Sequence, residues 1–210
     1  MKTTLDPAQH TFKSARFQKV VNQAIAFLEK TPVYALPPSE PFDGPGVYVL
    51  YYTGDFPYYT KIASANRSAL VQPIYIGKAV PEGWRTGRAL KQTTRKLYQR
   101  LREHARSIEH AENLEARDFC CRFMILSGDE TNLISVVESE LFRKYAPLWN
   151  AYIDGFGNHD PGKGRYDQAV SEWDTLHPGR PWAQKLKGHT PSKSDIIAKI
   201  PPHLLSSPLS

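Results

Sequence analysis

Three short runs of β-branched, aromatic and other apolar residues constrain the fold of this chain more than any other feature. The runs are GVYVLYY at 46–52, PIYIGK at 73–78 and DFCCRFMIL at 118–126. Their length, composition and bounding turn residues predict β-strands. Apolar residues at helical spacing predict helices at 16–30, about 93–111 and 131–145. The order helix, strand, strand, helix, strand, helix predicts an α+β domain with a small sheet.

The length of 210 residues suits a single domain, which we expect to span residues 1–210. Residues 53–73 separate the first two strands and are too many for a tight hairpin, so they predict an inserted segment with some structure of its own. A C-terminal extension is expected over 151–190. It begins with the Gly-rich loop GFGNHDPGKGR, and short helices are expected around 166–176 and 181–187. Residues 191–210, with several Pro and Ser, are expected to form a surface tail.

Composition excludes several classes of protein. The only two cysteines, Cys120 and Cys121, are adjacent and therefore point to opposite faces of a strand, which argues against a disulfide framework or a zinc site. The N-terminus lacks the apolar run of a signal peptide, and no apolar stretch is long enough to span a membrane. These observations favour a cytoplasmic protein with no membrane contact.

The net charge of +6 suggests an anionic partner, and the charge is concentrated in one stretch. Residues 78–106 hold nine Lys or Arg and only two acidic residues, with Trp84 and Tyr98 interspersed. This pattern suits a surface that binds the phosphate backbone of DNA, although a merely solvated charged face remains open. The candidate DNA-binding residues here and in the inserted segment are Arg85, Arg88, Lys91, Arg95, Lys61 and Arg67.

Two helices carry polar side chains at positions that face the core. Glu138 falls within the apolar arc of helix 131–145, whereas Glu140 points away from it. A carboxylate there needs a partner or a metal ion, so a buried salt bridge and a functional acid both remain open. Arg100 and His104 are four residues apart and share one helix face, which is typical of a joint site or of a solvated basic helix.

Five short motifs, which follow one another along the chain, include these residues. They are Gly46-Val47-Tyr48, Tyr75-Ile76-Gly77-Lys78, Arg100-Leu101-x-x-His104, the helical Glu138, and Pro147-x-x-Asn150. Together they resemble the GIY-YIG nuclease superfamily over residues 46–150, which would form its catalytic core. The chain departs from that pattern in two ways: the segment between Tyr48 and Tyr75 is unusually long, and Val47 replaces an isoleucine.

The resemblance implies a fold and a reaction. The fold would be a small, mostly antiparallel three-stranded sheet flanked by helices, with insertions and a C-terminal extension. The implied catalytic residues are Tyr48, Tyr75, Lys78, Arg100, His104, Glu138 and Asn150. Glu138 would bind Mg²⁺, Arg100 would neutralise the phosphoryl oxygens, and Tyr48 would orient and deprotonate water as cations such as Lys78 or the metal favour its phenolate. Tyr75 would position water, His104 would relay a proton, and Asn150 would brace the site.

Within the superfamily, the long insertion and the tail resemble the Type II restriction endonucleases that cut the palindrome CCGCGG. This implies Mg²⁺-dependent double-strand cleavage of a GC-rich palindrome in double-stranded DNA by a homodimer. Two alternatives stay open: a repair or homing-type nicking endonuclease, and a catalytically silent DNA-binding module. The first usually carries a separate DNA-binding module, of which the sequence shows no sign. The second is disfavoured because every catalytic position holds a suitable residue type.

Overall fold

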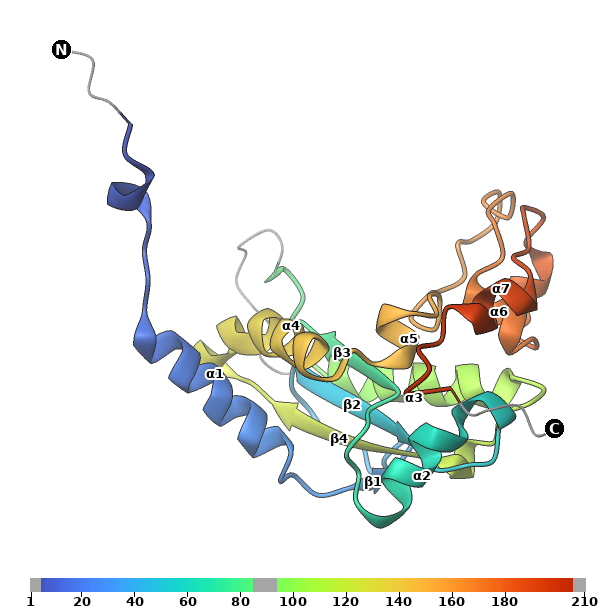
Figure 1. The fold of residues 1–210 in the computed structure, drawn as a ribbon, viewed down its shortest axis with the longest axis horizontal. Coiled ribbons are helices and arrows are strands. Elements are labelled where there is room, and N and C mark those ends of the chain that lie inside the picture. Colours follow the sequence, from blue (N-terminus) through green and yellow to red (C-terminus); the bar gives the residue numbers. More distant parts are fainter. Residues whose placement is uncertain (1–4, 85–93, 206–210) are drawn as a thin grey trace.

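The computed structural model describes residues 5–84 and 94–205, and it confirms the expected α+β fold (Figure 1). The strands are β1 (Tyr34–Ala35), β2 (Gly46–Tyr52), β3 (Tyr75–Ala79) and β4 (Phe119–Ile125). The longer helices are α1 (Ala15–Leu28), α2 (Thr60–Ser68), α3 (Lys96–His110) and α4 (Ile134–Tyr145). Shorter ones are α5 (Leu148–Ala151), α6 (Glu172–Leu176) and α7 (Lys193–Ala198). No helix among the described residues is long and apolar enough to cross a membrane.

The sheet has the strand order β1-β4-β2-β3, and every neighbouring pair is antiparallel. It contains four strands where the sequence predicts three. The additional strand β1 pairs only Tyr34 and Ala35 with Cys121 and Cys120 of β4. A pair of residues this short carries no periodicity, so sequence patterning cannot detect it.

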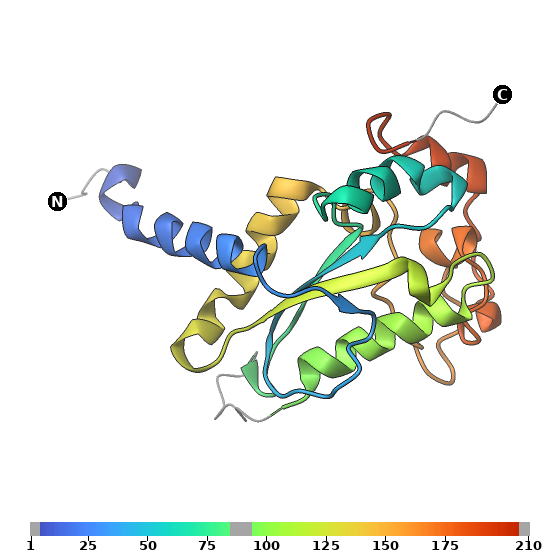
Figure 2. The same ribbon diagram turned by 90° about the horizontal axis from the view of Figure 1, so that it is seen from below.

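The central strand β2 divides the core between the two faces of the sheet, because successive side chains alternate. Tyr48, Leu50 and Tyr52 join the cluster that includes α3, α5 and the C-terminal residues. Val47, Val49 and Tyr51 join the cluster that includes α1 and α4 on the other face. Figure 2 shows α3 and α4 on opposite sides of the sheet. All residues of β2 are buried, as expected for a strand covered on both faces.

The inserted segment 53–73 has the structure of its own that the sequence predicts. It contains α2, whose Ile62 and Ala63 are fully buried, and Tyr59 immediately precedes this helix and is also buried. The buried amide of Asn66 donates to the carbonyl oxygens of Tyr52 and Gln72 at 3.0 and 2.9 Å. The segment therefore packs as part of the domain, and Asn66 closes its return to β3.

Residues 155–190 form a unit that we call the C-terminal lobe, and its helices are shorter than predicted. The expected helix at 166–176 is present only as α6, and the expected helix at 181–187 is a single 3-10 turn, Ala183–Lys185. Backbone hydrogen bonds instead join residues 166–170 to residues 187–189, including Val170 N to His189 O at 2.9 Å. These long-range bonds use the amides that a helix would need.

The prediction of a surface tail over 191–210 is wrong for its described part. Ile196 of α7 is fully buried, and Ile200 and Leu204 are 3% and 4% exposed within the main core. The Pro and Ser residues that suggested a tail lie beside these apolar residues, whose spacing of four places them on one side of the chain.

We expect Ile196→Ala to lower the free energy of unfolding by about 2–4 kcal/mol, because it removes a fully buried side chain and leaves a cavity. Urea unfolding followed by tryptophan fluorescence measures the change. Val71→Ala is the control: Val71 is 54% exposed, so its loss should stay within about 0.5 kcal/mol. Equal stability of the two variants would show that the C-terminal residues do not belong to the core.

Candidate active site

Tyr48 projects from β2 across the edge strand β3, and a glycine makes room for it. Tyr48 lies opposite Gly77 in the register of the two strands. A Cβ atom at Gly77 would lie 2.3 Å from the Tyr48 hydroxyl oxygen. Any larger residue at position 77 would therefore displace the Tyr48 phenol. The absence of a side chain at Gly77 thus makes room for the Tyr48 phenol beside the backbone of β3.

The Tyr48 hydroxyl forms a 2.6 Å hydrogen bond with Nε2 of His104 on α3. His104 is 2% exposed, and burial, together with the charge of Arg100, lowers its pKa well below the usual 6.5. Burial, followed by the neighbouring Tyr75, raises the pKa of Tyr48 well above 10, and Arg100 opposes this only in part. Both groups are therefore neutral, and the phenol donates to Nε2 when His104 carries its proton on Nδ1.

Tyr75 and Arg100 complete the group around this hydrogen bond. The Tyr48 and Tyr75 rings lie 6.3 Å apart, and the His104 ring lies 5.0 Å from Tyr75. Burial raises the pKa of Tyr75, while the positive charge of Arg100 works against it. Arg100 is partly exposed and is held by Glu103 at 2.8 Å. Its guanidinium is thus placed beside two phenols and remains open to an anionic ligand.

Glu138 reaches the same region from α4, on the other face of the sheet. Its carboxylate lies 2.6 Å from the Lys78 ammonium of β3, and its side chain is only 12% exposed. Burial raises the pKa of both Tyr48 and Tyr75, and the negative charge of Glu138 adds to this, as expected for a carboxylate near the two phenols. Lys78 pairs with Glu138, and the charge of Arg100 lowers the pKa of Tyr48 by less than burial raises it. The expectation that cations hold Tyr48 as a phenolate is therefore not met in the protein alone.

Asn150 braces the edge strand β3. Its Oδ1 accepts from the Ile76 amide at 2.8 Å, and its Nδ2 donates to the Ile76 carbonyl at 2.9 Å. The Asn150 side chain thereby forms the two hydrogen bonds that a neighbouring strand would otherwise make with the backbone of Ile76. This fixes the position of β3, which carries Tyr75, Gly77 and Lys78.

Three residues of the Gly-rich loop reach the site, and sequence reasoning missed them. The Phe156 ring stacks on His104 with centroids 4.6 Å apart and meets the edge of Tyr75 at 4.8 Å. Arg100 donates to Nε2 of His159, and a Cβ at Gly157 would lie 2.8 Å from the Tyr75 hydroxyl. The loop has no periodic pattern, so only its closeness in sequence to Asn150 hints at this role.

The predicted DNA-binding residues are more dispersed. Lys61 donates to the Pro202 carbonyl at 2.7 Å, Arg67 pairs with Asp55 at 2.6 Å, and Arg95 pairs with Asp43 at 3.3 Å. All three are exposed, and none forms a hydrogen bond or ion pair with the catalytic group. The remaining candidates, Arg85, Arg88 and Lys91, lie outside the described residues.

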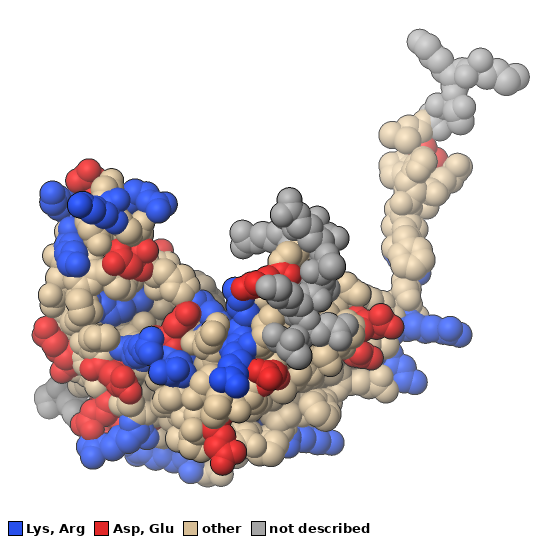
Figure 3. All heavy atoms as spheres, turned by 180° about the vertical axis from the view of Figure 1, so that it is seen from behind, with Lys and Arg blue, Asp and Glu red and all other residues tan. Residues whose placement is uncertain are grey.

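The C-terminal lobe adds a basic surface that was not among the predicted residues. Its exposed cations are Lys163, Arg165, Lys185 and Lys187. Figure 3 shows Lys and Arg side chains on this raised lobe and in the concave surface beside it. Such a concave basic surface suits a polyanion.

Within residues 5–84 and 94–205, no three His, Cys, Asp or Glu side chains gather closely enough to enclose a metal ion. Glu138 alone nevertheless fits Mg²⁺, which keeps several waters and binds through one or two carboxylates together with substrate phosphate. It offers a hard oxygen ligand, it is largely shielded from solvent, and its charge acts on the space that Tyr48 and Tyr75 line.

The small antiparallel sheet, the tyrosines flanking Gly77 and the Arg and His of α3 together define a nuclease domain of the GIY-YIG class. Residues 40–204 match the Eco29kI GIY-YIG domain, a restriction endonuclease family, so the chain belongs to that family. The protein is accordingly a nuclease of the restriction type, a class that binds DNA. The match extends through the C-terminal lobe and α7. No curated protein gives a significant match to the sequence.

Proposed function

We propose that the protein is a Type II restriction endonuclease that depends on Mg²⁺ and cuts both strands of a GC-rich palindrome in DNA. The observation that carries the catalytic part is the buried Tyr48–His104 hydrogen bond, with Arg100 and Glu138 acting on the same space. The GC-rich palindrome rests on the resemblance to enzymes that cut CCGCGG.

In the proposed reaction, the Tyr48 oxygen accepts a proton from the attacking water while its own proton passes to Nε2 of His104. The phenol stays neutral throughout, which agrees with a raised pKa, and the imidazole carries the charge. A neutral His104 in its Nδ1–H tautomer has a lone pair on Nε2 that can accept the proton, and the negative charge of the bound phosphate would offset the burial and the Arg100 charge that disfavour the imidazolium. The proton then leaves to solvent, and a solvent proton neutralises the departing oxygen.

Arg100 is placed to neutralise charge on the phosphoryl oxygens of the transition state, because it is partly exposed and already oriented by Glu103 and His159. Glu138 would hold Mg²⁺, which supplies Lewis-acid stabilisation of the same charge. Lys78 would then release Glu138 and remain beside the phosphate as a second cation.

Fragment mapping tests this function. Digestion of a phage genome with Mg²⁺ should give discrete fragments whose sequenced ends share one palindrome, with breaks in both strands. Heterogeneous ends would contradict sequence specificity. Nicked circles that never become linear would instead support the homing- or repair-type alternative, and intact DNA would support the silent binding module.

We further propose that the enzyme acts as a homodimer, since the motif set occurs once per chain and one site cuts one strand. Helix α1 buries Val21 and Leu28 against the domain, whereas its outer face leaves Phe17, Val20 and Phe27 between 42% and 61% exposed. By helical spacing these three fall in one apolar set with Val21 and Leu28. Ahead of α1, Phe12 is 89% exposed on a segment that extends away from the body (Figure 1). Such an apolar surface is typical of an interface.

A mixture of wild-type protein with excess Glu138→Gln protein tests the dimer on a plasmid bearing one site. Mixed dimers hold one competent site, so nicked circles should accumulate. Linear product in proportion to the wild-type protein, with no excess of nicked circles, would show that each chain makes both cuts alone.

A further inference from the structure

The C-terminal lobe buries an ion pair between Arg180, which is 2% exposed, and Asp174, which is 5% exposed. The Arg180 guanidinium binds the Asp174 carboxylate in two places, Nε to Oδ1 and Nη2 to Oδ2, both at 2.6 Å. The guanidinium carbon lies 4.6 Å from the ring centroids of both Trp173 and Trp182. Asp174 is held in turn by Ser171 at 2.7 Å. A planar, bidentate cation between two aromatic rings is an arrangement that arginine makes and lysine does not.

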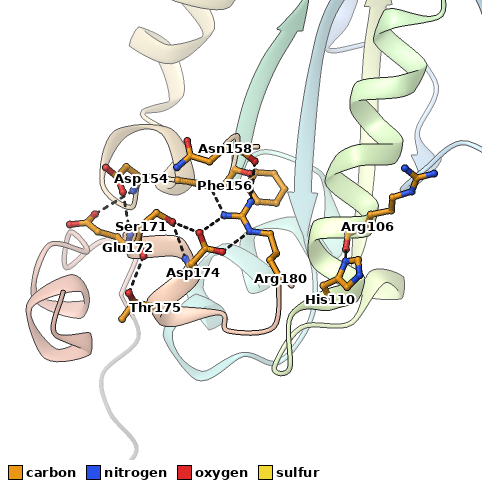
Figure 4. Close-up of polar contacts among 11 residues, drawn as sticks. Arg106, His110, Asp154, Phe156, Asn158, Ser171, Glu172, Asp174, Thr175 and Arg180 are labelled. Carbon is orange, nitrogen blue, oxygen red and sulfur yellow. Dashed lines mark hydrogen bonds and ion pairs between the residues drawn. The ribbon is translucent and has the colours of Figure 1, made fainter. Parts of the chain in front are cut away.

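The remaining guanidinium donors all bind one short segment of the chain. Nη1 donates to the carbonyl oxygens of Phe156 and Asn158 at 3.1 and 3.3 Å, and Nη2 donates to that of Gly155 at 2.9 Å. Figure 4 shows these contacts converging on Arg180 from the loop. Three carbonyl groups of the loop 155–159 are thereby fixed by a single buried side chain.

The same loop contacts three members of the catalytic group. Phe156 stacks on His104 and meets Tyr75, Gly157 lies against the Tyr75 hydroxyl, and His159 accepts a hydrogen bond from Arg100. Arg180 makes none of these contacts itself. Arg180 instead donates hydrogen bonds to three carbonyl groups of the loop, and these fix the loop backbone that carries Phe156, Gly157 and His159.

We propose that Arg180, paired with Asp174, is a positioning residue for catalysis: it holds the loop 155–159 against His104, Tyr75 and Arg100. This inference rests on the proposed nuclease function. Displacing a catalytic group by about 1 Å can cost on the order of 10²-fold in rate, whereas DNA affinity draws on many dispersed contacts. Loss of the guanidinium should therefore lower kcat far more than it raises KM.

Arg180→Lys tests the proposal, because lysine keeps the positive charge opposite Asp174 but cannot bind the carboxylate and three carbonyls together. We expect kcat to fall on the order of 10²-fold with KM within about threefold. Phe156→Leu leaves the Arg180 contacts intact and breaks the loop's contact with His104, so it should reproduce the fall in kcat. Ile196→Ala is the matched control, since it destabilises the same end of the molecule and leaves every hydrogen bond between Arg180 and the loop in place.

A second readout does not require cleavage. The His104 ring signals in NMR spectra of the full chain should shift in Arg180→Lys and in Phe156→Leu, but not in Ile196→Ala. An active wild type with an unchanged kcat in Arg180→Lys contradicts the proposal, as do unshifted His104 signals. A wild type without cleavage contradicts the proposed function alone, while the NMR comparison still decides the role of Arg180.

A different observation points to how the lobe recognises DNA. A hollow of about 320 Å³ lies beside the loop, and its lining includes Asn158, His159, Arg165, Gln168 and Trp182. Among the described residues, the side chains of Asn158, Arg165 and Gln168 form no hydrogen bond or ion pair. A guanidinium group without a partner in the protein can form hydrogen bonds with a guanine edge, and a free Asn or Gln amide can do so with an adenine edge.

We infer that this hollow receives base edges next to the cleaved phosphate, because His159 lines it and also contacts Arg100. This inference, too, rests on the proposed function. With the preferred site taken from fragment mapping, Arg165→Ala should lower the ratio of specific to non-specific binding at least about tenfold. Arg117→Ala, at an exposed ion pair with Glu115, is the control and should leave the ratio unchanged. If Arg165→Ala left this ratio unchanged, or lowered affinity equally for specific and non-specific DNA, the inference that the hollow binds base edges would be contradicted. A wild type with no sequence preference contradicts the proposed specificity itself.

Discussion

Glu138→Gln protein is expected to bind DNA normally and to cleave it at least on the order of 10³-fold more slowly than wild type. The amide keeps the size of the side chain but removes the charge that would hold Mg²⁺. Glu138 is largely shielded from solvent, and its charge acts on Tyr48 and Tyr75. Single-turnover cleavage and a filter-binding assay measure the two properties on one preparation.

Glu140→Gln is the matched control, because Glu140 lies on the same helix but pairs with Arg143 on its surface. It should cleave at nearly the wild-type rate. If Glu140→Gln were inactive and Glu138→Gln active, the assignment of the metal-binding carboxylate would be wrong.

Tyr48→Phe should lose on the order of 10²-fold or more in the rate of cleavage, and Arg100→Ala should lose as much. Phenylalanine fills the same space beside Gly77, so the fold stays intact while the hydrogen bond to His104 is lost. Single-turnover rates at saturating DNA isolate the chemical step.

Tyr51→Phe provides the control for a lost buried hydroxyl. Tyr51 lies on the opposite face of β2, is 4% exposed, and has a pKa that burial also raises. It should cleave like wild type. Full activity in Tyr48→Phe would exclude its hydroxyl from the reaction and with it the proton path to His104.

The regular elements around the site could be predicted because their patterns are local. The strand run 46–52 coincides with β2, and the helix pattern 131–145 contains α4. Turn residues and apolar periodicity mark such elements within the segment itself. The position of Glu138 within its apolar arc likewise follows from helical spacing alone.

The parts that sequence reasoning missed depend on contacts between distant residues. Strand β1 exists only through its pairing with β4, and residues 166–170 form turns and irregular backbone in place of a helix because they bond to 187–189. Helical spacing groups Phe17 and Phe27 with Val21 and Leu28, whereas the residues of α1 that are buried in the core are Val21, Ile25 and Leu28. No local pattern encodes such choices.

The candidate site divides in the same way. The order of the motifs identified Tyr48, Tyr75, Arg100, His104 and Glu138 as site residues. In the structure these side chains lie around one space. Sequence reasoning did not find Phe156, His159 or Arg180, since each acts through a partner far away in sequence. It also expected Lys78 or the metal to favour the phenolate of Tyr48, and in the structure the Lys78 ammonium pairs with Glu138.

The most direct test of the central claim is cleavage of supercoiled plasmid by the full chain, with Mg²⁺ and with EDTA in its place. Wild-type protein should give linear fragments of defined length only with Mg²⁺, and Glu138→Gln should give none in either condition. Cleavage that continues in EDTA, or a folded wild-type protein that binds plasmid and leaves it supercoiled with Mg²⁺, would contradict the proposed magnesium-dependent endonuclease.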